Sequence, residues 1–221
     1  MDRDTSTGTR SPARENEVFF RQWLRSPKSM GSLVPSSKAL ARAIAAEVAW
    51  RPGQTIVELG GGTGAITNGL LEAGIPPEAL VVIELDPPLY RYLRDRFPRV
   101  RVVQGDATRL GEILSGLGVQ EVGTVVSGLP MIQMPLGFQR AIMEESFRVL
   151  PPDGFVVQYS FSPLVPIPAE RLNIEAKRVK VIVRNLPPAF LWRFRPRRER
   201  AMGGNGGNGR NNGAVNGAYQ G

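Results

Sequence analysis

A glycine-rich segment at residues 55–64 constrains the fold of this chain more than any other feature. It reads Thr-Ile-Val-Glu-Leu-Gly-Gly-Gly-Thr-Gly, and residues that favour a helix follow from Ala65. A short β-branched run that ends in glycines before a helix predicts a strand, a tight turn and a helix N-terminus. The glycines remove the Cβ atoms that would keep a ligand from the backbone, and the N–H groups at the helix start favour polar or negative groups. We therefore expect a bound nucleoside at this turn.

Three carboxylates stand where such a ligand would need them. Glu84 ends the next predicted strand, 22 positions after Gly62, near the roughly 20-residue offset at which an acid accepts hydrogen bonds from ribose hydroxyls. Asp106 follows a third predicted strand, where it could accept from an adenine amino group. The glycine spacing also fits a dinucleotide fingerprint that ends at Ala65. Glu58, however, precedes the glycines, where it would repel a pyrophosphate but could hold a cationic amino group.

Together these segments resemble the class I S-adenosylmethionine-dependent methyltransferases. The resemblance implies that the glycine turn lies against the methionine moiety, that Glu84 holds the ribose and that Asp106 holds the adenine. It also implies S-adenosyl-L-homocysteine as the product. The cofactor-binding residues that it implies are Glu58, Gly60, Gly62, Thr63, Gly64, Glu84, Leu85, Gly105, Asp106, Ala107 and Ser127.

The chain contains neither cysteine nor histidine. This composition excludes disulfides, thiolate nucleophiles, Cys/His zinc sites and histidine-based acid–base pairs, and we expect no metal. Methyl transfer is compatible with it, because a sulfonium cofactor carries its own leaving group and the protein mainly supplies alignment.

Strands and helices alternate along the middle of the chain. Runs of β-branched residues predict strands at 54–59, 80–85, 100–104, 122–127, 154–160, 177–185 and 189–195. Apolar periodicity predicts helices at 38–50, 65–73, 88–96, 109–116 and 136–148. The last two strands have only a tight connection and should pair as an antiparallel hairpin at the sheet edge. We therefore expect an α/β fold with a doubly wound, seven-stranded Rossmann-like sheet whose last strand is antiparallel.

Three regions are expected along the chain. The resemblance implies a methyltransferase domain at residues 30–200, and the composition of the Gly/Asn-rich tail at 201–221 predicts disorder. Residues 1–29 combine a flexible N-terminus with an amphipathic helix at 14–25. Large apolar residues beside arginines suit either packing on the domain or an interfacial membrane anchor. No apolar stretch reaches the roughly 20 residues of a spanning helix.

Positive charge is concentrated near the C-terminus. Residues 171–200 contain ten Lys or Arg and two Glu, in a chain whose net charge is +8. A local basic field of this kind favours a polyanionic surface, either nucleic acid or anionic lipid.

The residues after the fourth predicted strand, Ser-Gly-Leu-Pro-Met at 127–131, bear on the methyl acceptor. Ribosomal RNA adenine N6-methyltransferases carry Asn-Leu/Ile-Pro-Tyr there, so that an amide holds the exocyclic amine and a ring stacks the base. Here Gly128 replaces the Asn and Met131 replaces the Tyr. A flat base would thus lack its hydrogen-bonding amide and its stacking ring, whereas a compact aliphatic amine beside an apolar wall would fit.

With these substitutions the chain resembles the small bacterial phospholipid N-methyltransferases, which convert phosphatidylethanolamine stepwise to phosphatidylcholine. The segments that carry this resemblance are 20–28, 36–41, 58–64, 127–130 and 158–160. The resemblance implies a phospholipid substrate and an anionic membrane surface as partners, and no nucleic acid. We expect a cytoplasmic monomer, peripherally associated with the inner face of the cell membrane. The alternatives are an rRNA adenine N6-dimethyltransferase-like or a small-molecule amine methyltransferase.

Within this interpretation, Tyr159 would orient the amine through its hydroxyl, and its alternative role is to fill the sheet edge. The catalytic residues that we expect are Tyr159, Ser127 and Gly128. The expected lipid and membrane contacts are Phe19, Phe20, Arg21, Trp23, Leu24, Arg25, Lys28, Met131, Lys180 and Arg184.

Overall fold

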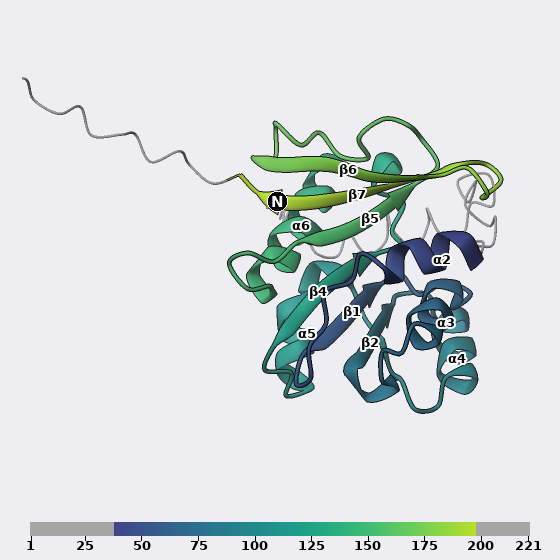
Figure 1. The fold of residues 1–221 in the computed structure, drawn as a ribbon. Coiled ribbons are helices and arrows are strands. Elements are labelled where there is room, and N and C mark those ends of the chain that lie inside the picture. The colour runs from purple at the N-terminus through teal and green to yellow at the C-terminus, as the bar shows by residue number, and fades with distance from the viewer. Residues whose placement is uncertain (1–37, 198–221) are drawn as a thin grey trace, which may run out of the picture.

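Seven strands form one sheet in the computed structural model, which describes residues 38–197 (Figure 1). The strand order is β3-β2-β1-β4-β5-β7-β6. The five parallel strands are β1 (Thr55–Leu59), β2 (Leu80–Glu84), β3 (Arg101–Gln104), β4 (Val122–Ser127) and β5 (Val156–Ser160). β7 (Ala189–Pro196) runs antiparallel between β5 and β6 (Ile174–Ile182). The expected sheet and its antiparallel last strand are confirmed.

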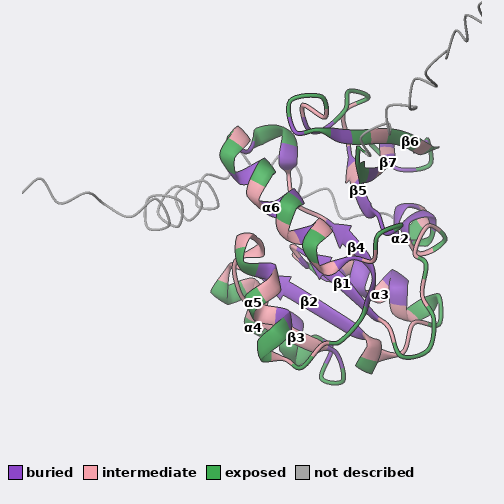
Figure 2. Cartoon of the chain, turned by 90° about the vertical axis from the view of Figure 1, so that its left-hand side faces the viewer, coloured by how far each residue is buried: buried purple, intermediate pink, exposed green. Residues whose placement is uncertain are grey.

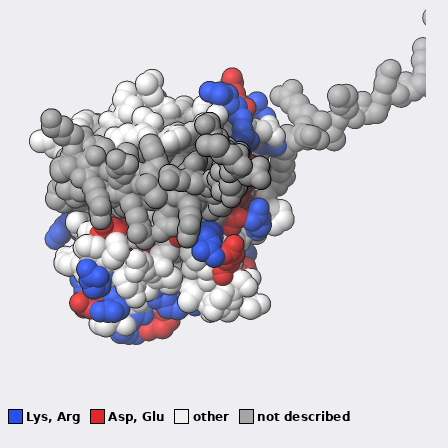
Figure 3. Space-filling view, turned by 180° about the vertical axis from the view of Figure 1, so that it is seen from behind, with Lys and Arg blue, Asp and Glu red and all other residues white. Residues whose placement is uncertain are grey.

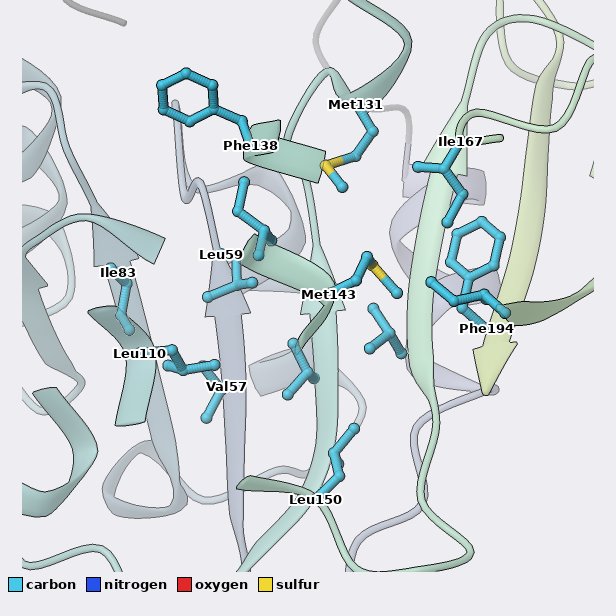
Figure 4. Close-up of a cluster of buried hydrophobic side chains, with 14 of the residues drawn as sticks. Val57, Leu59, Ile83, Leu110, Met131, Phe138, Met143, Leu150, Ile167 and Phe194 are labelled. Carbon is cyan, nitrogen blue, oxygen red and sulfur yellow. The ribbon is translucent and has the colours of Figure 1, made fainter. Parts of the chain in front are cut away.

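Helices cover both faces of the sheet, so its central strands are buried along their whole length. Every residue of β1, β2 and β4 is buried (Figure 2), as their near-continuous apolar runs require. One face is covered by α2 (Lys38–Ala45), α3 (Ala65–Glu72) and α4 (Pro87–Arg96). The other is covered by α5 (Leu110–Gly116) and α6 (Leu136–Val149), whose side chains pack on β1 and β4 (Figure 4). Three short 3-10 helices are η1 (Pro77–Ala79), η2 (Ala107–Arg109) and η3 (Met131–Gln133).

The first described helix is shorter than the sequence suggests. We expected a helix at 38–50, but α2 ends at Ala45. The following residues are drawn toward the sheet instead, because both the N–H and the C=O of Ala49 bond to Thr124 Oγ1, at 3.1 and 2.9 Å. The Trp50 Nε1–H also donates to the Gln54 carbonyl at 2.9 Å. These bonds compete with the last helical turns.

The sixth strand lies three residues earlier than expected, at 174–182 and not at 177–185. At its N-terminal end, Ile174 pairs with Pro196 of β7. After its C-terminal end the chain turns, and the backbone N–H of Asn185 donates to the Ile182 carbonyl at 3.3 Å.

Several expectations concern residues outside the described range. They are the helix at 14–25, the contacts of Phe19, Phe20, Arg21, Trp23, Leu24, Arg25 and Lys28, and the tail at 201–221. These remain predictions. Within residues 38–197, no helix has the length and apolar character needed to cross a membrane.

Candidate active site

Two turns meet at the point where the strand order reverses. β1 and β4 are neighbours in the sheet, and the chain leaves them toward opposite faces. The N–H of Gly128, after β4, donates to the Leu59 carbonyl at 2.8 Å. A Cβ on Gly60, after β1, would lie 2.8 Å from the Leu129 side chain. Open α/β sheets bind their ligands in the crevice at such a switch point.

The glycine turn after β1 leaves its backbone open to a ligand. Gly60 and Gly62 have φ of +75° and +53°, in the left-handed region that favours glycine. A Cβ on Gly62 would meet no atom within 4 Å. The turn can therefore be approached at Gly62, and its one exposed side chain is Thr63.

Glu84 at the end of β2 is joined to this turn. Its Oε2 accepts from the Gly62 N–H at 2.9 Å and its Oε1 accepts from the Asp86 N–H at 2.9 Å. Burial raises the pKa of the Glu84 carboxyl, and these backbone bonds offset part of that rise. Each carboxylate oxygen has a second lone pair, so hydroxyls of a ligand can still donate to Glu84.

Asp106 lies beside Glu84 at the same edge of the sheet. Its Oδ1 accepts from the Thr108 N–H at 2.8 Å, which caps the N-terminus of η2. The Gly105 N–H donates to the Glu84 carbonyl at 3.1 Å, and a Cβ on Gly105 would lie 2.6 Å from Ile113. Leu85 and Ala107 are half-buried around these acids. The structure thus gathers the three segments singled out in the sequence, and their donor and acceptor groups suit a nucleoside.

Glu58 lies beneath the glycine turn and is only 1% exposed. Its Oε2 accepts from Thr67 Oγ1 of α3 at 2.7 Å. Burial raises the pKa of Glu58 to about 8, with a further rise from the charge of Glu84, while the Thr67 bond lowers it. Glu58 is therefore an internal carboxyl group of this site and does not line its open side.

The turn after β4 brings the expected catalytic residues together. Ser127 is buried, and its Oγ accepts from the Leu129 N–H at 3.4 Å. A Cβ on Gly128 would lie 2.8 Å from the Gly60 carbonyl oxygen and 3.5 Å from the Tyr159 hydroxyl. The hydroxyl of half-buried Tyr159 therefore lies near the contact between the turn after β1 and the turn after β4.

Two buried glutamines that the sequence reasoning missed hold this second turn in place. Gln158 Nε2 donates to the carbonyls of Leu129 and Tyr159, each at 2.9 Å. Gln139 Nε2 donates to the carbonyls of Met131 and Met134, at 2.7 and 2.9 Å. The polar Gln158 within the apolar run of β5 was the available signal.

The apolar residue that reaches the surface of this turn is Ile132. Met131, expected to form an apolar wall, is 1% exposed and packs between the sheet and α6 (Figure 4). Ile132 is 50% exposed.

Charged side chains are distributed unevenly over the described part of the molecule. Basic and acidic side chains lie close together over the lower part of the back face (Figure 3). Exposed ion pairs within the described residues include Arg94–Asp95 and Arg99–Glu78. Lys180 and Arg184, by contrast, form no ion pair within residues 38–197. Over the same range, no cluster of three or more carboxylates could hold a metal ion.

Sequence comparison relates the chain to two groups of proteins. The ribosomal RNA adenine dimethylase family matches residues 25–111. An ornithine lipid N-methyltransferase of Singulisphaera acidiphila is 34% identical over 178 residues, which cover 79% of this chain and 93% of that protein. A ribosomal RNA small subunit methyltransferase A of Maridesulfovibrio salexigens is 33% identical over 106 residues, 48% of this chain but only 39% of that protein.

Structural comparison shows the same fold. The 1,6-didemethyltoxoflavin-N1-methyltransferase of Burkholderia thailandensis, solved with S-adenosylhomocysteine, superposes with a TM-score of 0.57. The two are 16% identical, and the match covers 89% of this chain and 93% of that one. At this identity the likeness concerns the arrangement of helices and strands.

Proposed function

Because the chain belongs to the class I S-adenosylmethionine-dependent N-methyltransferases, in one family with the ornithine lipid N-methyltransferase of S. acidiphila, we propose that it methylates the amine of a membrane lipid. The observation that carries the proposal is the extent of the similarity to that relative. An alignment over 79% of this chain at 34% identity must include the turn after β4 and Tyr159, whereas the match to the rRNA family model ends at residue 111. A ribosomal RNA small subunit methyltransferase A of Laribacter hongkongensis also aligns over 69% of this chain, but at 28% identity.

Two lipids compete as the substrate. From the sequence resemblance we propose phosphatidylethanolamine, methylated stepwise to phosphatidylcholine. The relative's name supports ornithine lipid instead. Both present a primary aliphatic amine, which is the group that the small Gly128 and the Tyr159 hydroxyl would suit.

Cofactor binding would use the first three segments of the site. S-adenosylmethionine supplies an electrophilic methyl group and leaves as S-adenosyl-L-homocysteine. Glu84 would accept from the ribose hydroxyls and Asp106 from the adenine amine, with the backbone near Gly62 against the methionine moiety. The position of each group at the strand ends and its remaining hydrogen-bond capacity support these roles.

The acceptor amine is cationic at neutral pH and must lose a proton before it can attack. The chain has no histidine to take that proton. We assign Tyr159 the role of orienting the amine, with water or a nearby acid as the final proton acceptor. Its ring, which meets Phe161 edge to face at 5.9 Å, also offers an aromatic face to the amine as it gains methyl groups and loses N–H donors.

Peripheral association with the inner face of the cell membrane belongs to this proposal, as does a monomeric state. An amphipathic helix at 14–25 and the basic residues Lys180 and Arg184 would supply the contacts with anionic lipid.

The proposal is tested by incubating the protein with labelled S-adenosylmethionine and one of four acceptors. These are vesicles that contain phosphatidylethanolamine, vesicles that contain ornithine lipid, vesicles of phosphatidylcholine alone, and ribosomal RNA. We expect label in the lipid fraction of one or both amine-bearing vesicles, and none in phosphatidylcholine. Glu84→Ala serves as a variant with impaired cofactor binding. Label in RNA alone would overturn the proposal and support the rRNA alternative.

A further inference from the structure

The hairpin formed by β6 and β7 extends past the carboxyl edge of the parallel strands. Ser127, the last residue of β4, lies in one row with Gln158 of β5, Trp192 of β7 and Arg178 of β6. β6 continues from this row to Ile182, and the connecting turn occupies 183–188. At about 3.3 Å per residue the tip stands roughly 15 Å beyond Ser127. The hairpin therefore extends beyond the sheet edge that carries the candidate active site.

The tip of this hairpin is apolar on the outside. Val183 is 75% exposed and Leu186 is 86% exposed. Two polar residues lie between them. Asn185 turns inward, because it is 1% exposed and its Nδ2 donates to the Pro187 carbonyl at 2.7 Å, whereas Arg184 is exposed. The turn thus presents two apolar side chains beside one cation, where an ordinary surface loop presents polar residues.

Basic side chains flank this apolar tip. Residues 176–193 contain five Lys or Arg and no acidic residue. Four of the five are exposed: Lys177, Arg178, Lys180 and Arg184. Apolar side chains at a tip, with one cation between them and others behind, are an arrangement that an anionic bilayer binds, since the apolar side chains enter the headgroup boundary and the cations meet phosphates.

A second apolar loop leaves the same end of the sheet. Ser160, the last residue of β5, lies in one row with Phe190 and Val181 of the hairpin. Leu164, four residues further along the chain, is 72% exposed. α2 also contacts β6, and Figure 1 shows α2 and the hairpin tip on the same side of the molecule.

We propose that the β6–β7 hairpin, together with the loop at 161–165, is a second membrane-docking surface that inserts into an anionic bilayer and turns the acceptor side of the site toward the lipid. This inference rests on the proposed function, because it is the lipid substrate that makes a bilayer the relevant partner. It is independent of any contact made by residues 14–25.

The absence of cysteine allows a direct test by fluorescence. Leu186→Cys and Leu164→Cys each introduce the single thiol of the chain, which is labelled with an environment-sensitive fluorophore. With vesicles of phosphatidylglycerol and phosphatidylethanolamine, we expect blue-shifted emission at both sites and quenching by a lipid-borne quencher. Tyr92→Cys on the outer side of α4, a residue 45% exposed, is the matched control and should stay in water. A Leu186→Cys label that stays in water, on bound or unbound protein, overturns the proposal.

A binding experiment separates this inference from the proposed function. Val183→Ser combined with Leu186→Ser should lower partitioning onto the same vesicles at least tenfold and leave cofactor affinity unchanged, since both residues are exposed and distant from Glu84. Methylation of a dispersed short-chain lipid amine should persist. If the double variant partitions onto vesicles as well as the parent does, or if the label shifts to the blue at high protein concentration without vesicles, the docking proposal is wrong and the proposed function is unaffected. If the parent protein methylates neither dispersed nor bilayer lipid amines, the proposed function is wrong.

Discussion

Thr67 Oγ1 donates a 2.7 Å hydrogen bond to Glu58 Oε2 beneath the glycine turn, so that a carboxyl group with a pKa of about 8 supports the turn from inside. The pKa of Glu58 in the folded protein lies above its ordinary value of 4.5. The folded state therefore holds a proton that the unfolded state has lost, and its stability must fall as pH rises from about 4.5 through about 8.

Replacing this carboxyl group should flatten the pH dependence of folding. In the parent without cofactor, Glu58 contributes a loss of at most about 1.4 kcal/mol of unfolding free energy per pH unit in that window. Glu58→Gln should remove this contribution, and the variant should be the more stable protein at alkaline pH. Denaturant unfolding across pH measures both curves. Parallel curves would show that Glu58 does not titrate as its burial implies.

Glu84 should control cofactor affinity. Glu84→Ala removes an acceptor available to ribose hydroxyls and releases the Gly62 N–H, which should cost about 1.5–3 kcal/mol of binding free energy. Calorimetry should show binding of S-adenosylmethionine weakened roughly ten- to a hundredfold. Glu78→Ala is the matched control, because exposed Glu78 precedes the same strand at its opposite end. Equal affinities of the two variants for S-adenosylmethionine would contradict the assignment of Glu84 to the cofactor site.

Tyr159 should affect methyl transfer more than cofactor binding. Tyr159→Phe keeps the ring against Phe161 and removes the hydroxyl near Gly128. Turnover should fall, and the first methylation should suffer more than the third, because the amine has most N–H donors to orient at the start. Mass spectrometry of the mono-, di- and trimethylated lipids measures each step, with Tyr92→Phe as the control. Parental rates at every step would leave Tyr159 a packing role.

Gln158 should position the turn after β4. Gln158→Leu leaves the carbonyls of Leu129 and Tyr159 without their donor, which should cost about 1–3 kcal/mol of stability. Below the melting temperature of the variant, we expect lower turnover with an unchanged dissociation constant for S-adenosylmethionine. Exposed Gln120, replaced by leucine, is the control. Weakened cofactor binding would instead indicate a general loosening of the sheet edge.

Gly128 should tolerate no side chain. The Cβ of Gly128→Ala would approach the Gly60 carbonyl to 2.8 Å, a backbone atom that cannot rotate away. We expect a loss of about 1–3 kcal/mol in stability together with lost activity. Gly137→Ala in α6 meets nothing within 4 Å and should be neutral or stabilising by about 0.5–1 kcal/mol. Thermal unfolding compares the two variants, and equal melting temperatures would contradict a close contact between Gly128 and the Gly60 carbonyl.

The sheet and the clustering of its acids were predictable because local signals decide them. Glycines after a buried strand define the turn near Gly62, and the carboxyl ends of parallel strands share one edge, which brings Glu84 and Asp106 together. Placing Tyr159 near Gly128 needed only the further assumption that β4 and β5 are neighbours, which the register confirms.

Features that depend on distant partners were not predictable. α2 ends early because Thr124, 75 positions along the chain, bonds to Ala49. The clamp between Gln158 and Leu129 spans 29 positions, and the sequence shows only a polar residue within an apolar strand. The burial of Glu58 depends on α3 closing over it, whereas the sequence places it simply before a turn.

The insertion of β7 between β5 and β6 determines the order in which the acceptor half of the sheet can be completed. Ribosomes deliver β6 before the strand that must separate it from β5. Until Ala189–Pro196 has emerged, β5 is an open edge and Gln158 and Tyr159 lack their neighbours Trp192 and Leu191. The strands that carry the nucleoside site, β1 to β4, make no backbone pairing with this segment. A nascent chain can therefore pair these four strands before it acquires the surface on which the methyl group is delivered.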